Sequence, residues 1–280
     1  MRFWKYHGLG NDYIVINPAD CHGGLNEEQI KKICHRNFGI GSDGILFGPS
    51  KISQVEFDLR IFNPDGSEAE KSGNGLRIFS RYLWDQKLVG FASFLVHTLG
   101  GKVKCLVHHG AEQITVEMGG VSFDSSKIPV KGNKREVIEE ELSILDHTFI
   151  FSAASIGNPH CVILKENISE EETKKYGPFI EVEDRFPNRT NVQFMKILDR
   201  KNIQIEIWER GAGYTLASGS SSCAAAAVAH KLGHCDDQIT VHMPGGKLAI
   251  TVLPGYHILM RGPVQKICSG IIHTEMFKEI

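Results

Sequence analysis

The stretch GLGNDYIVI, residues 8–16, decides the fold because a similar stretch, SIGNPHCVIL, recurs at residues 155–164. In each, a Gly-Asn turn opens or interrupts an apolar strand. A second pair of similar segments follows in step. PDGSEAEKSGNGLRIFSRYL comes after a strand ending at Asn63, and GAGYTLASGSSSCAAAAVAHKL comes after a strand ending at Arg210. Two pairs of segments in the same order predict a duplicated domain, because chance likeness rarely keeps its order.

The spacing within the two halves supports this duplication. Asn11 and Ser72 are 61 positions apart (72 − 11), and Asn158 and Ser218 are 60 apart (218 − 158). We place the boundary near the Gly119-Gly120 break, which gives a first domain of residues 1–118 and a second of 119–263, with 264–280 returning to the first as a closing strand. Equivalent loops of a duplicated domain face each other, so the two serines are expected across an interdomain cleft, where small-ligand sites are common.

The periodicity between these segments predicts a mixed α and β fold. Residues 55–63 and 203–210 alternate apolar with polar side chains, which is typical of half-buried strands. Residues 25–39 predict a helix with Asn26 as N-cap, Gln29 at the capping-box position and Gly39 as a stop signal near its end.

Composition narrows the class of partner. The 280 residues are 41% apolar, and 31 basic against 33 acidic residues give a net charge of −2. This balance predicts neither nucleic-acid nor membrane binding and favours a small-molecule partner. The N-terminus has charged and glycine residues where a signal peptide needs an apolar run, so we expect a cytoplasmic protein. Seven scattered cysteines without a CxxC pair indicate reduced thiols.

No motif for a metal or a cofactor competes with these segments. The adjacent histidines in VHH, residues 107–109, have no carboxylate or cysteine at ligand spacing nearby, so no metal site is predicted. There is no P-loop, and GNGLR is too short for a dinucleotide fingerprint. We therefore expect a protein that works without a cofactor.

Both serines are predicted at helix N-termini, where free amide groups and the helix dipole attract an anion. Gly73, Gly75 and Gly219 leave the backbone open to a ligand. Two such helix ends could hold a carboxylate and stabilise the enolate-like charge formed when its α-proton leaves. Racemisation and α,β-elimination have this requirement. Either loop alone is more typical of a plain serine N-cap with a glycine turn. Both loops in register, with Asn11 and Asn158 also paired, favour the anion site instead.

At these residues the sequence resembles the diaminopimelate epimerase family of cofactor-independent amino-acid epimerases and racemases. The resemblance covers essentially the whole chain, and its motifs occur in the family's order: KYHGLGNDYIVI, FGIGSDGILF, FNPDGSEAEKSGNGLR, GNPHCVI, NVQF, WERGAG and MPGGKL. It implies two similar pseudo-symmetric α/β domains, each a mixed sheet around a central helix, often in a homodimer. It also implies inversion at Cα of diaminopimelate or a related amino acid, a step toward lysine and peptidoglycan precursors.

The sequence departs from the family's pattern at the reacting groups. The resemblance implies a cysteine at each of the positions held by Ser72 and Ser218, where one thiolate removes the α-proton and the other thiol protonates the opposite face. Tyr214 stands where the family usually has glutamate, and Ser220-Ser221 stand where Thr-Gly is usual. Cys223 matches a downstream cysteine in the helix, and we expect it to be buried in the packing.

The substrate-gripping positions match the family better. By resemblance, the groups that hold the distal amino-acid end are Asn63, Asn158, Asn191 and Arg210. Those at the reacting carbon are Asn11, Glu209 and the amides of Gly73-Asn74 and Gly219-Ser220. Asn191 has an alternative as a turn residue, and Arg210 has one as an ion pair with Glu209. His160 has one as a buried strand histidine with its hydrogen bonds satisfied.

Serine at both positions leaves the reaction open. A hydroxyl is a much weaker acid than a thiol, and a helix dipole stabilises charge by only about 0.3–2 kcal/mol, so an alkoxide needs a neighbouring base. The candidates for this assistance are Lys71, Glu209, His160 and Tyr214. Three functions fit: an epimerase with assisted serines, a dehydratase or isomerase of a hydroxylated amino acid, or a binding protein without chemistry. A deliberate Cys-to-Ser double substitution would give the same serines but leaves Tyr214 unexplained.

Overall fold

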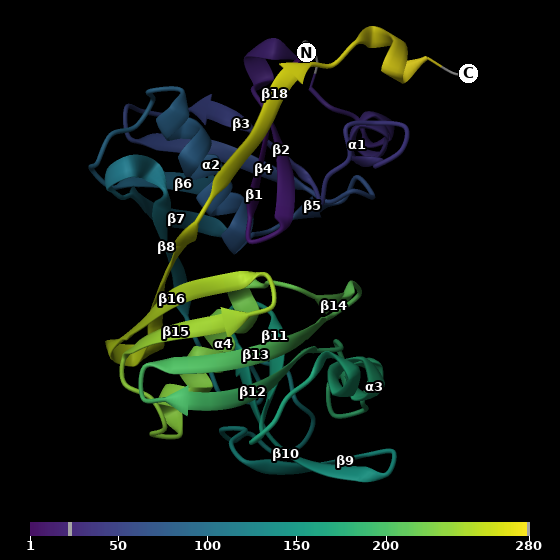
Figure 1. Cartoon of the computed structure of the whole chain (residues 1–280), viewed down its shortest axis with the longest axis vertical. Coiled ribbons are helices and arrows are strands. Elements are labelled where there is room, and N and C mark those ends of the chain that lie inside the picture. The colour runs from purple at the N-terminus through teal and green to yellow at the C-terminus, as the bar shows by residue number, and fades with distance from the viewer. Residues whose placement is uncertain (22–23, 279–280) are drawn as a thin grey trace. The chain divides into compact units, whose positions relative to one another are not determined.

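The computed structural model describes residues 1–21 and 24–278 and divides the chain into two compact units (Figure 1). Unit 1 comprises Met1–Val116 and Arg261–Ile280, and unit 2 comprises Glu117–Met260. The chain passes from one unit to the other within β8 (Gln113–Gly120) and β17 (His257–Pro263). The first crossing falls beside the Gly119-Gly120 break that the sequence analysis used as the boundary.

Unit 1 is a mixed sheet with two α-helices. Its elements are β1 (Arg2–Gly8), β2 (Asn11–Ile16), α1 (Glu27–Cys34), β3 (Ile45–Lys51), β4 (Glu56–Phe62), β5 (Glu68–Ala69), α2 (Gly73–Asp85), β6 (Phe94–Thr98), β7 (Gly101–Val107), β8 and β18 (Gln265–Ile271). Strand β18 pairs antiparallel with β1, which pairs antiparallel with β2. Then β2–β3 is parallel, β3–β4 antiparallel, β4–β6 parallel and β6–β7 antiparallel. The C-terminal segment thus joins the first sheet as a strand.

Unit 2 repeats this plan. Its elements are β9 (Glu140–Ile144), β10 (His147–Ser155), β11 (Pro159–Leu164), α3 (Glu170–Glu181), β12 (Asn191–Asp199), β13 (Asn202–Glu209), β14 (Gly213–Thr215), α4 (Gly219–Lys231), β15 (Gln238–Met243), β16 (Gly246–Leu253) and β17. Pairs β9–β10 and β10–β11 are antiparallel, and β11–β12 is parallel. Then β12–β13 is antiparallel, β13–β15 parallel and β15–β16 antiparallel.

The two sheets therefore share one sequence of antiparallel and parallel pairings, strand for strand. Short β5 pairs with β4 just before α2, and short β14 pairs with β13 just before α4. This common order is the topological counterpart of the internal repeat, and it confirms the mixed, sheet-dominated α/β fold.

Helices α2 and α4 are both packed against their sheets, but their buried side chains differ in size. Helix α2 packs against β1, β2, β3 and β7 with large side chains such as Leu76, Phe79 and Leu83. Helix α4 contacts strands β10, β11, β12, β13, β15 and β16, and its residues 223–229 are all buried. A helix that is apolar all round belongs inside a core. The small side chains of CAAAAVA let the sheet of unit 2 approach α4 closely.

The structure confirms some of the local predictions and corrects others. Asn26 caps α1 in a full capping box with Gln29, as expected. However, α1 ends at Cys34, before Gly39, because residues 35–39 fold back along it. A Cβ on Gly39 would lie 1.9 Å from the Lys32 carbonyl oxygen, so only glycine fits there. In β4 the alternating apolar residues Phe57, Leu59 and Ile61 are buried, but Val55 lies outside the strand and is exposed.

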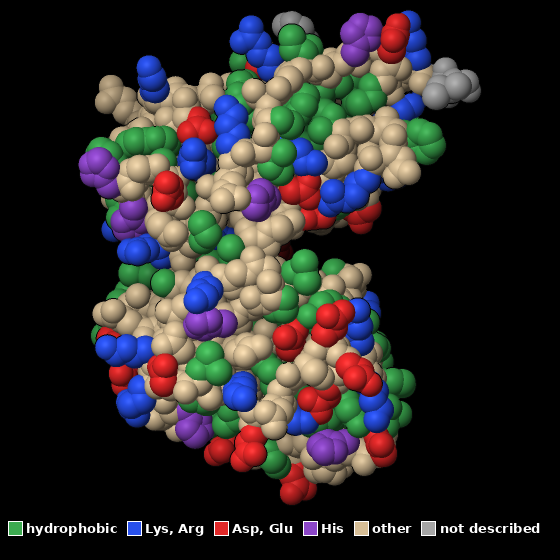
Figure 2. Space-filling view, viewed as in Figure 1, with side chains coloured by type: hydrophobic (Ala, Val, Ile, Leu, Met, Phe, Trp, Pro, Cys, Tyr) green, Lys and Arg blue, Asp and Glu red, His purple; other side chains and the backbone are tan. Residues whose placement is uncertain are grey.

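The surface carries both signs of charge. Figure 2 shows Lys and Arg side chains interspersed with Asp and Glu over each unit. Six of the seven cysteines are buried and Cys268 is exposed, and none of the seven forms a disulfide. Within residues 1–21 and 24–278, every helix is too short or too polar to cross a membrane.

Candidate functional site

Ser72 is the N-cap of α2, as the sequence predicts. Its backbone is extended, and its Oγ accepts a hydrogen bond of 3.0 Å from the Gly75 amide. The hydroxyl of Tyr13, on β2, lies 3.2 Å from the same Oγ. Lys71, the residue before Ser72, is half-buried. The serine hydroxyl is thus fixed at the positive end of a helix, in contact with a second hydroxyl.

Asn11 and Asn74, both predicted at the reacting carbon, contact each other beside this helix end. Asn74 donates to Asn11 Oδ1 at 3.0 Å, and Asn11 donates to Asp43 Oδ2 at 2.9 Å. Arg77, which is fully buried in α2, donates to Asn74 Oδ1. The chain of contacts fixes both amides at the start of α2, next to Ser72.

Asp43 is the anchor of this network, a role that was not predicted from the sequence. Its carboxylate accepts from the Asp12 amide at 3.0 Å as well as from Asn11, and Arg36 bridges it to the Asp12 carboxylate. Burial raises the pKa of Asp12, but hydrogen bonds from Arg36 and Lys5 outweigh burial and hold that pKa below its usual range. Asp43 lies in FGIGSDGILF, a matched motif, which was the available signal.

Ser218 is the N-cap of α4, again as predicted, but it is held differently. It is 4% exposed, and its Oγ lies 3.5 Å from the Ser221 amide, at the outer limit of a hydrogen bond. Its carbonyl accepts from the Ser222 hydroxyl at 2.7 Å. Ser221 in turn accepts from Gln193 at 3.0 Å. The two serines therefore cap equivalent helices with different surroundings. Gly219 is buried behind Ser218, while Ser220 is half-buried.

His160 is completely buried on β11, with Nε2 3.0 Å from Asn158 Oδ1. Burial lowers the pKa of His160 to about 3, and a hydrogen bond with Gln193 opposes that shift only in part. The imidazole is therefore neutral at physiological pH. It can orient the Asn158 amide, but it is a poor base and does not supply a fixed positive charge.

Asn191 joins the start of β12 to the turn after β13. Its Oδ1 accepts from the Arg210 amide at 3.0 Å, and its Nδ2 donates to the Pro159 carbonyl at 2.9 Å. The Arg210 guanidinium donates to the Asn188 carbonyl at 3.0 Å. The structure thus brings the predicted residues Asn158, Asn191 and Arg210 to one edge of unit 2. Asn63 lies in unit 1, where it donates to Ser67 at 2.9 Å across the β4–β5 turn.

The carboxylate of Glu209 and the ring of Tyr214 belong to the same β13–β14 pair. Thr215 donates to Glu209 Oε2 at 3.3 Å. The Tyr214 hydroxyl donates to Glu206 at 2.6 Å, and the Lys174 ammonium lies 5.0 Å from the Tyr214 ring centre. Burial, together with the bond to Glu206, raises the pKa of Tyr214. The Tyr214 hydroxyl thus already donates its proton to Glu206. Tyr214 could assist Ser218 only after this hydrogen bond breaks.

Glu181, at the end of α3, holds the turn that carries Glu209 and Arg210. The carboxylate is almost fully buried and accepts from the Trp208 indole at 2.7 Å and the Gly211 amide at 2.8 Å. Arg189 forms an ion pair with it. Gly177 lets α3 approach, because a Cβ there would lie 2.7 Å from Trp208. Nothing in the local sequence around Glu181 predicts these contacts.

We expect Glu181→Gln to lower the free energy of unfolding by about 1–3 kcal/mol, because the amide can no longer accept from all its donors and presents its own NH₂ to them. Glu171→Gln, on the exposed face of α3, is the matched control. Urea unfolding of the full chain measures both. A difference of less than about 0.5 kcal/mol between the variants would show that Glu181 does not anchor the turn.

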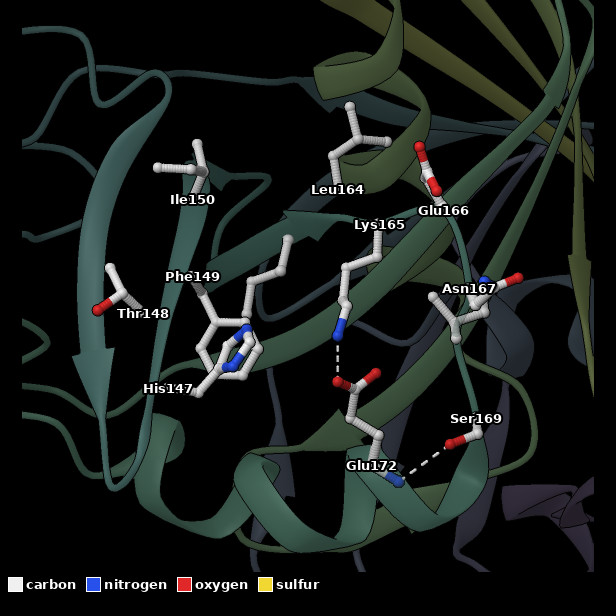
Figure 3. A pocket seen from close by; sticks show the side chains of 12 residues that line it. His147, Thr148, Phe149, Ile150, Leu164, Lys165, Glu166, Asn167, Ser169 and Glu172 are labelled. Atoms are coloured by element: carbon white, nitrogen blue, oxygen red, sulfur yellow. Dashed lines mark hydrogen bonds and ion pairs between the residues drawn. The ribbon is translucent and has the colours of Figure 1, made fainter.

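A cavity of about 600 Å³ lies elsewhere in unit 2, between β10, the end of β11 and the start of α3 (Figure 3). Lys165 and Glu172 form an ion pair in its wall, and Ser169 caps α3 by accepting from the Glu172 amide at 3.1 Å. Lys165 and Glu172, two of the charged groups in this wall, thus neutralise each other. The cavity lining contains none of the residues predicted for the site.

Comparison with known proteins first defines the class. The fold is similar to a PhzF-family phenazine biosynthesis protein of Bacillus anthracis, with a TM-score of 0.69, 17% identity and coverage of 96% of this chain and 98% of that chain. It is also similar to a probable proline racemase of Agrobacterium radiobacter, with a TM-score of 0.68, 13% identity and coverage of 99% and 94%. At these identities the likeness shows a shared mixed α/β, sheet-dominated fold.

Sequence comparison then gives the family. The diaminopimelate epimerase family matches residues 3–123 and 152–267. Diaminopimelate epimerase 2 of Nostoc sp. is 60% identical over 277 residues, which cover 99% of this chain and 97% of that protein. The diaminopimelate epimerase of Moorella thermoacetica is 38% identical over 281 residues, covering 96% and 98%. This chain belongs to the diaminopimelate epimerase family of cofactor-independent isomerases.

Proposed function

We propose that this protein inverts Cα of diaminopimelate, and that Ser72 and Ser218 act on opposite faces of that carbon. The observation that carries the proposal is the equivalence of the two serines. Each caps the helix that follows the same short strand in the same strand order of its unit. Together with family membership, this supports one reaction served by both halves. The reaction belongs to the supply of lysine and peptidoglycan precursors.

In this proposal the serines take the places of the family's two cysteines. Each helix N-terminus presents free amides to a carboxylate, and these amides stabilise the enolate-like charge that develops on deprotonation. Neighbouring groups then provide the base that a serine hydroxyl needs to lose its proton. For Ser218 we propose Glu209 as the assisting base, because its carboxylate lies at the end of β13, beside β14, from which the chain leads to Ser218. For Ser72, the adjacent Lys71 is a candidate assisting group.

The residues proposed to bind the substrate are assigned from their contacts within each unit. In unit 2, Asn158, Asn191 and Arg210 lie at one edge and are assigned to the distal amino-acid end, with Asn63 of unit 1 as a fourth group. Asn11 and the amides of Gly73-Asn74 and Gly219-Ser220 are assigned to the reacting end. Support comes from the hydrogen bonds that hold Asn11 and Asn74 beside Ser72.

A second function has one observation in its favour. Serine hydroxyls at both positions are poor acids and poor bases, which suits a protein that binds an amino acid without reacting with it. A dehydratase of a hydroxylated amino acid is a third possibility on the same scaffold. The cytoplasmic location expected from the N-terminal sequence and the homodimer implied by the resemblance remain predictions.

Incubation with L,L-diaminopimelate in deuterated water distinguishes these functions. The proposal predicts deuterium at Cα together with formation of the meso isomer, both measured by mass spectrometry and chiral chromatography. Binding in calorimetry without any exchange would contradict the proposal and support the binding protein. A dehydrated or oxo-acid product from a hydroxylated amino acid would support the dehydratase.

A further inference from the structure

Tyr13 is the polar neighbour of Ser72 that the sequence analysis did not single out. It lies on β2, two residues after Asn11, with 7% of its surface exposed. Its hydroxyl lies 3.2 Å from Ser72 Oγ, and either hydroxyl can donate. A Cβ at Gly44 would come within 2.7 Å of Tyr13 Cε1, so the ring lies against the Gly44 backbone. Packing thus fixes where the phenol points.

The bonds at Ser72 favour one arrangement of protons. A serine oxygen has one proton and two lone pairs. The Gly75 amide uses one lone pair. When Tyr13 donates, it uses the other, and the proton of Ser72 is left to point away from both partners. Accepting two hydrogen bonds also stabilises negative charge on the serine oxygen.

The chemistry of the two hydroxyls differs. A phenol has an ordinary pKa of about 10, whereas an aliphatic hydroxyl is a far weaker acid. A proton is therefore more easily exchanged with solvent through a tyrosine than through a serine. In unit 2 the equivalent position is His160, whose Nε2 contacts Asn158, so the tyrosine–serine pair is a feature of unit 1.

We propose that Tyr13 is a proton-relay partner that positions and reprotonates Ser72, an inference that rests on the proposed function. When Ser72 protonates the substrate, its O–H bond breaks and a Cα–H bond forms with the electron pair of the carbanion. The Tyr13 proton passes to Ser72 Oγ and leaves a tyrosinate, which solvent reprotonates. In the reverse direction Ser72 takes the α-proton while its own proton passes to tyrosinate, and the Cα electron pair stays on the substrate.

Tyr13→Phe keeps the buried ring and removes only the hydroxyl. We expect kcat for diaminopimelate to fall about 100-fold, within the range of general acid–base effects, while KM changes less than about 3-fold. The alkaline limb of the pH profile, which reports the relay's protonation state, disappears in this variant. Tyr176→Phe is the matched control, because Tyr176 is also 7% exposed and donates to a side chain, Asp146, at 3.1 Å. We expect the control to retain wild-type kcat.

A rescue experiment separates the relay from a folding defect. Adding Ser72→Cys to Tyr13→Phe is expected to restore turnover, because a thiol with an ordinary pKa of about 8.5 does not need the phenol. Wild-type kcat and pH profile in Tyr13→Phe would overturn the relay while leaving the proposed function intact. Loss of activity that Ser72→Cys cannot restore would also overturn it. Absence of exchange in the wild-type protein would overturn the proposed function and this inference together.

Discussion

Ser72→Ala and Ser218→Ala are each expected to lower the rate of diaminopimelate inversion by about 10²–10⁴-fold, because each removes one of the two groups that we propose to transfer the α-proton. Ligand affinity is expected to change only a few-fold, since the helix amides that we propose to hold the carboxylate remain. Chiral chromatography of the products measures inversion, and calorimetry measures affinity.

Two controls keep this result interpretable. Losing an N-cap costs about 1 kcal/mol, whereas glycine at the cap costs only a few tenths, so Ser72→Gly removes the hydroxyl with little loss of stability. Ser80→Ala removes a hydroxyl of the same helix that donates to the Leu76 carbonyl. Inversion close to the wild-type rate in Ser72→Gly would exclude Ser72 from proton transfer.

Ser72→Cys combined with Ser218→Cys is expected to raise kcat by about 10–100-fold near pH 8. A thiol with an ordinary pKa of about 8.5, lowered at a helix N-terminus, supplies a base at neutral pH that a hydroxyl cannot. Because the thiolate is the deprotonated form, the gain grows as pH rises toward the thiol pKa. Rates are measured in the presence of a reductant.

An unchanged rate in this double variant would indicate that more than the acid–base atoms differs from the family. Tyr214 is then the first residue to test, since the resemblance implies a glutamate at its position. In the structure its hydroxyl is bound to Glu206 and its ring lies near Lys174. These contacts hold the Tyr214 side chain against β13 and α3, and we therefore expect Tyr214 to leave the gain from the two cysteines intact.

Much of the fold could be predicted because its signals are local or repeated. The Gly-Asn turns and Ser-Gly helix starts recur at nearly constant spacing, and the structure shows one strand order in both units. The capping box of α1 and the caps of α2 and α4 depend on residues three positions apart, which sequence shows directly. The early end of α1 depends on how residues 35–39 fold back, which local propensity does not encode.

The supporting groups of the candidate site could not be predicted in the same way. Asp43 contacts Asn11 across 32 positions, Glu181 contacts Gly211 across 30, and Tyr13 contacts Ser72 across 59. Each pair meets only because a particular strand register or helix packing brings it together. Motifs identified the residues assigned to the substrate, whereas tertiary contacts identify the residues that hold them.

The two serines have different surroundings in their units. Ser72 accepts from a backbone amide and contacts a phenol. Ser218 is more deeply buried, with a long contact of 3.5 Å to its capped amide. We therefore expect the two serines to contribute unequally, with the phenol serving one and a carboxylate, Glu209, serving the other.

The most direct test of two groups on opposite faces is the isotopic content of both isomers during the first turnovers in deuterated water. With separate groups on the two faces, meso-diaminopimelate formed from the L,L isomer carries one deuterium at the inverted carbon, while the recovered L,L isomer carries none. Mass spectrometry after chiral separation gives both values. An inverted product that retains its original proton, or a starting isomer labelled as fast as the product forms, would contradict the account.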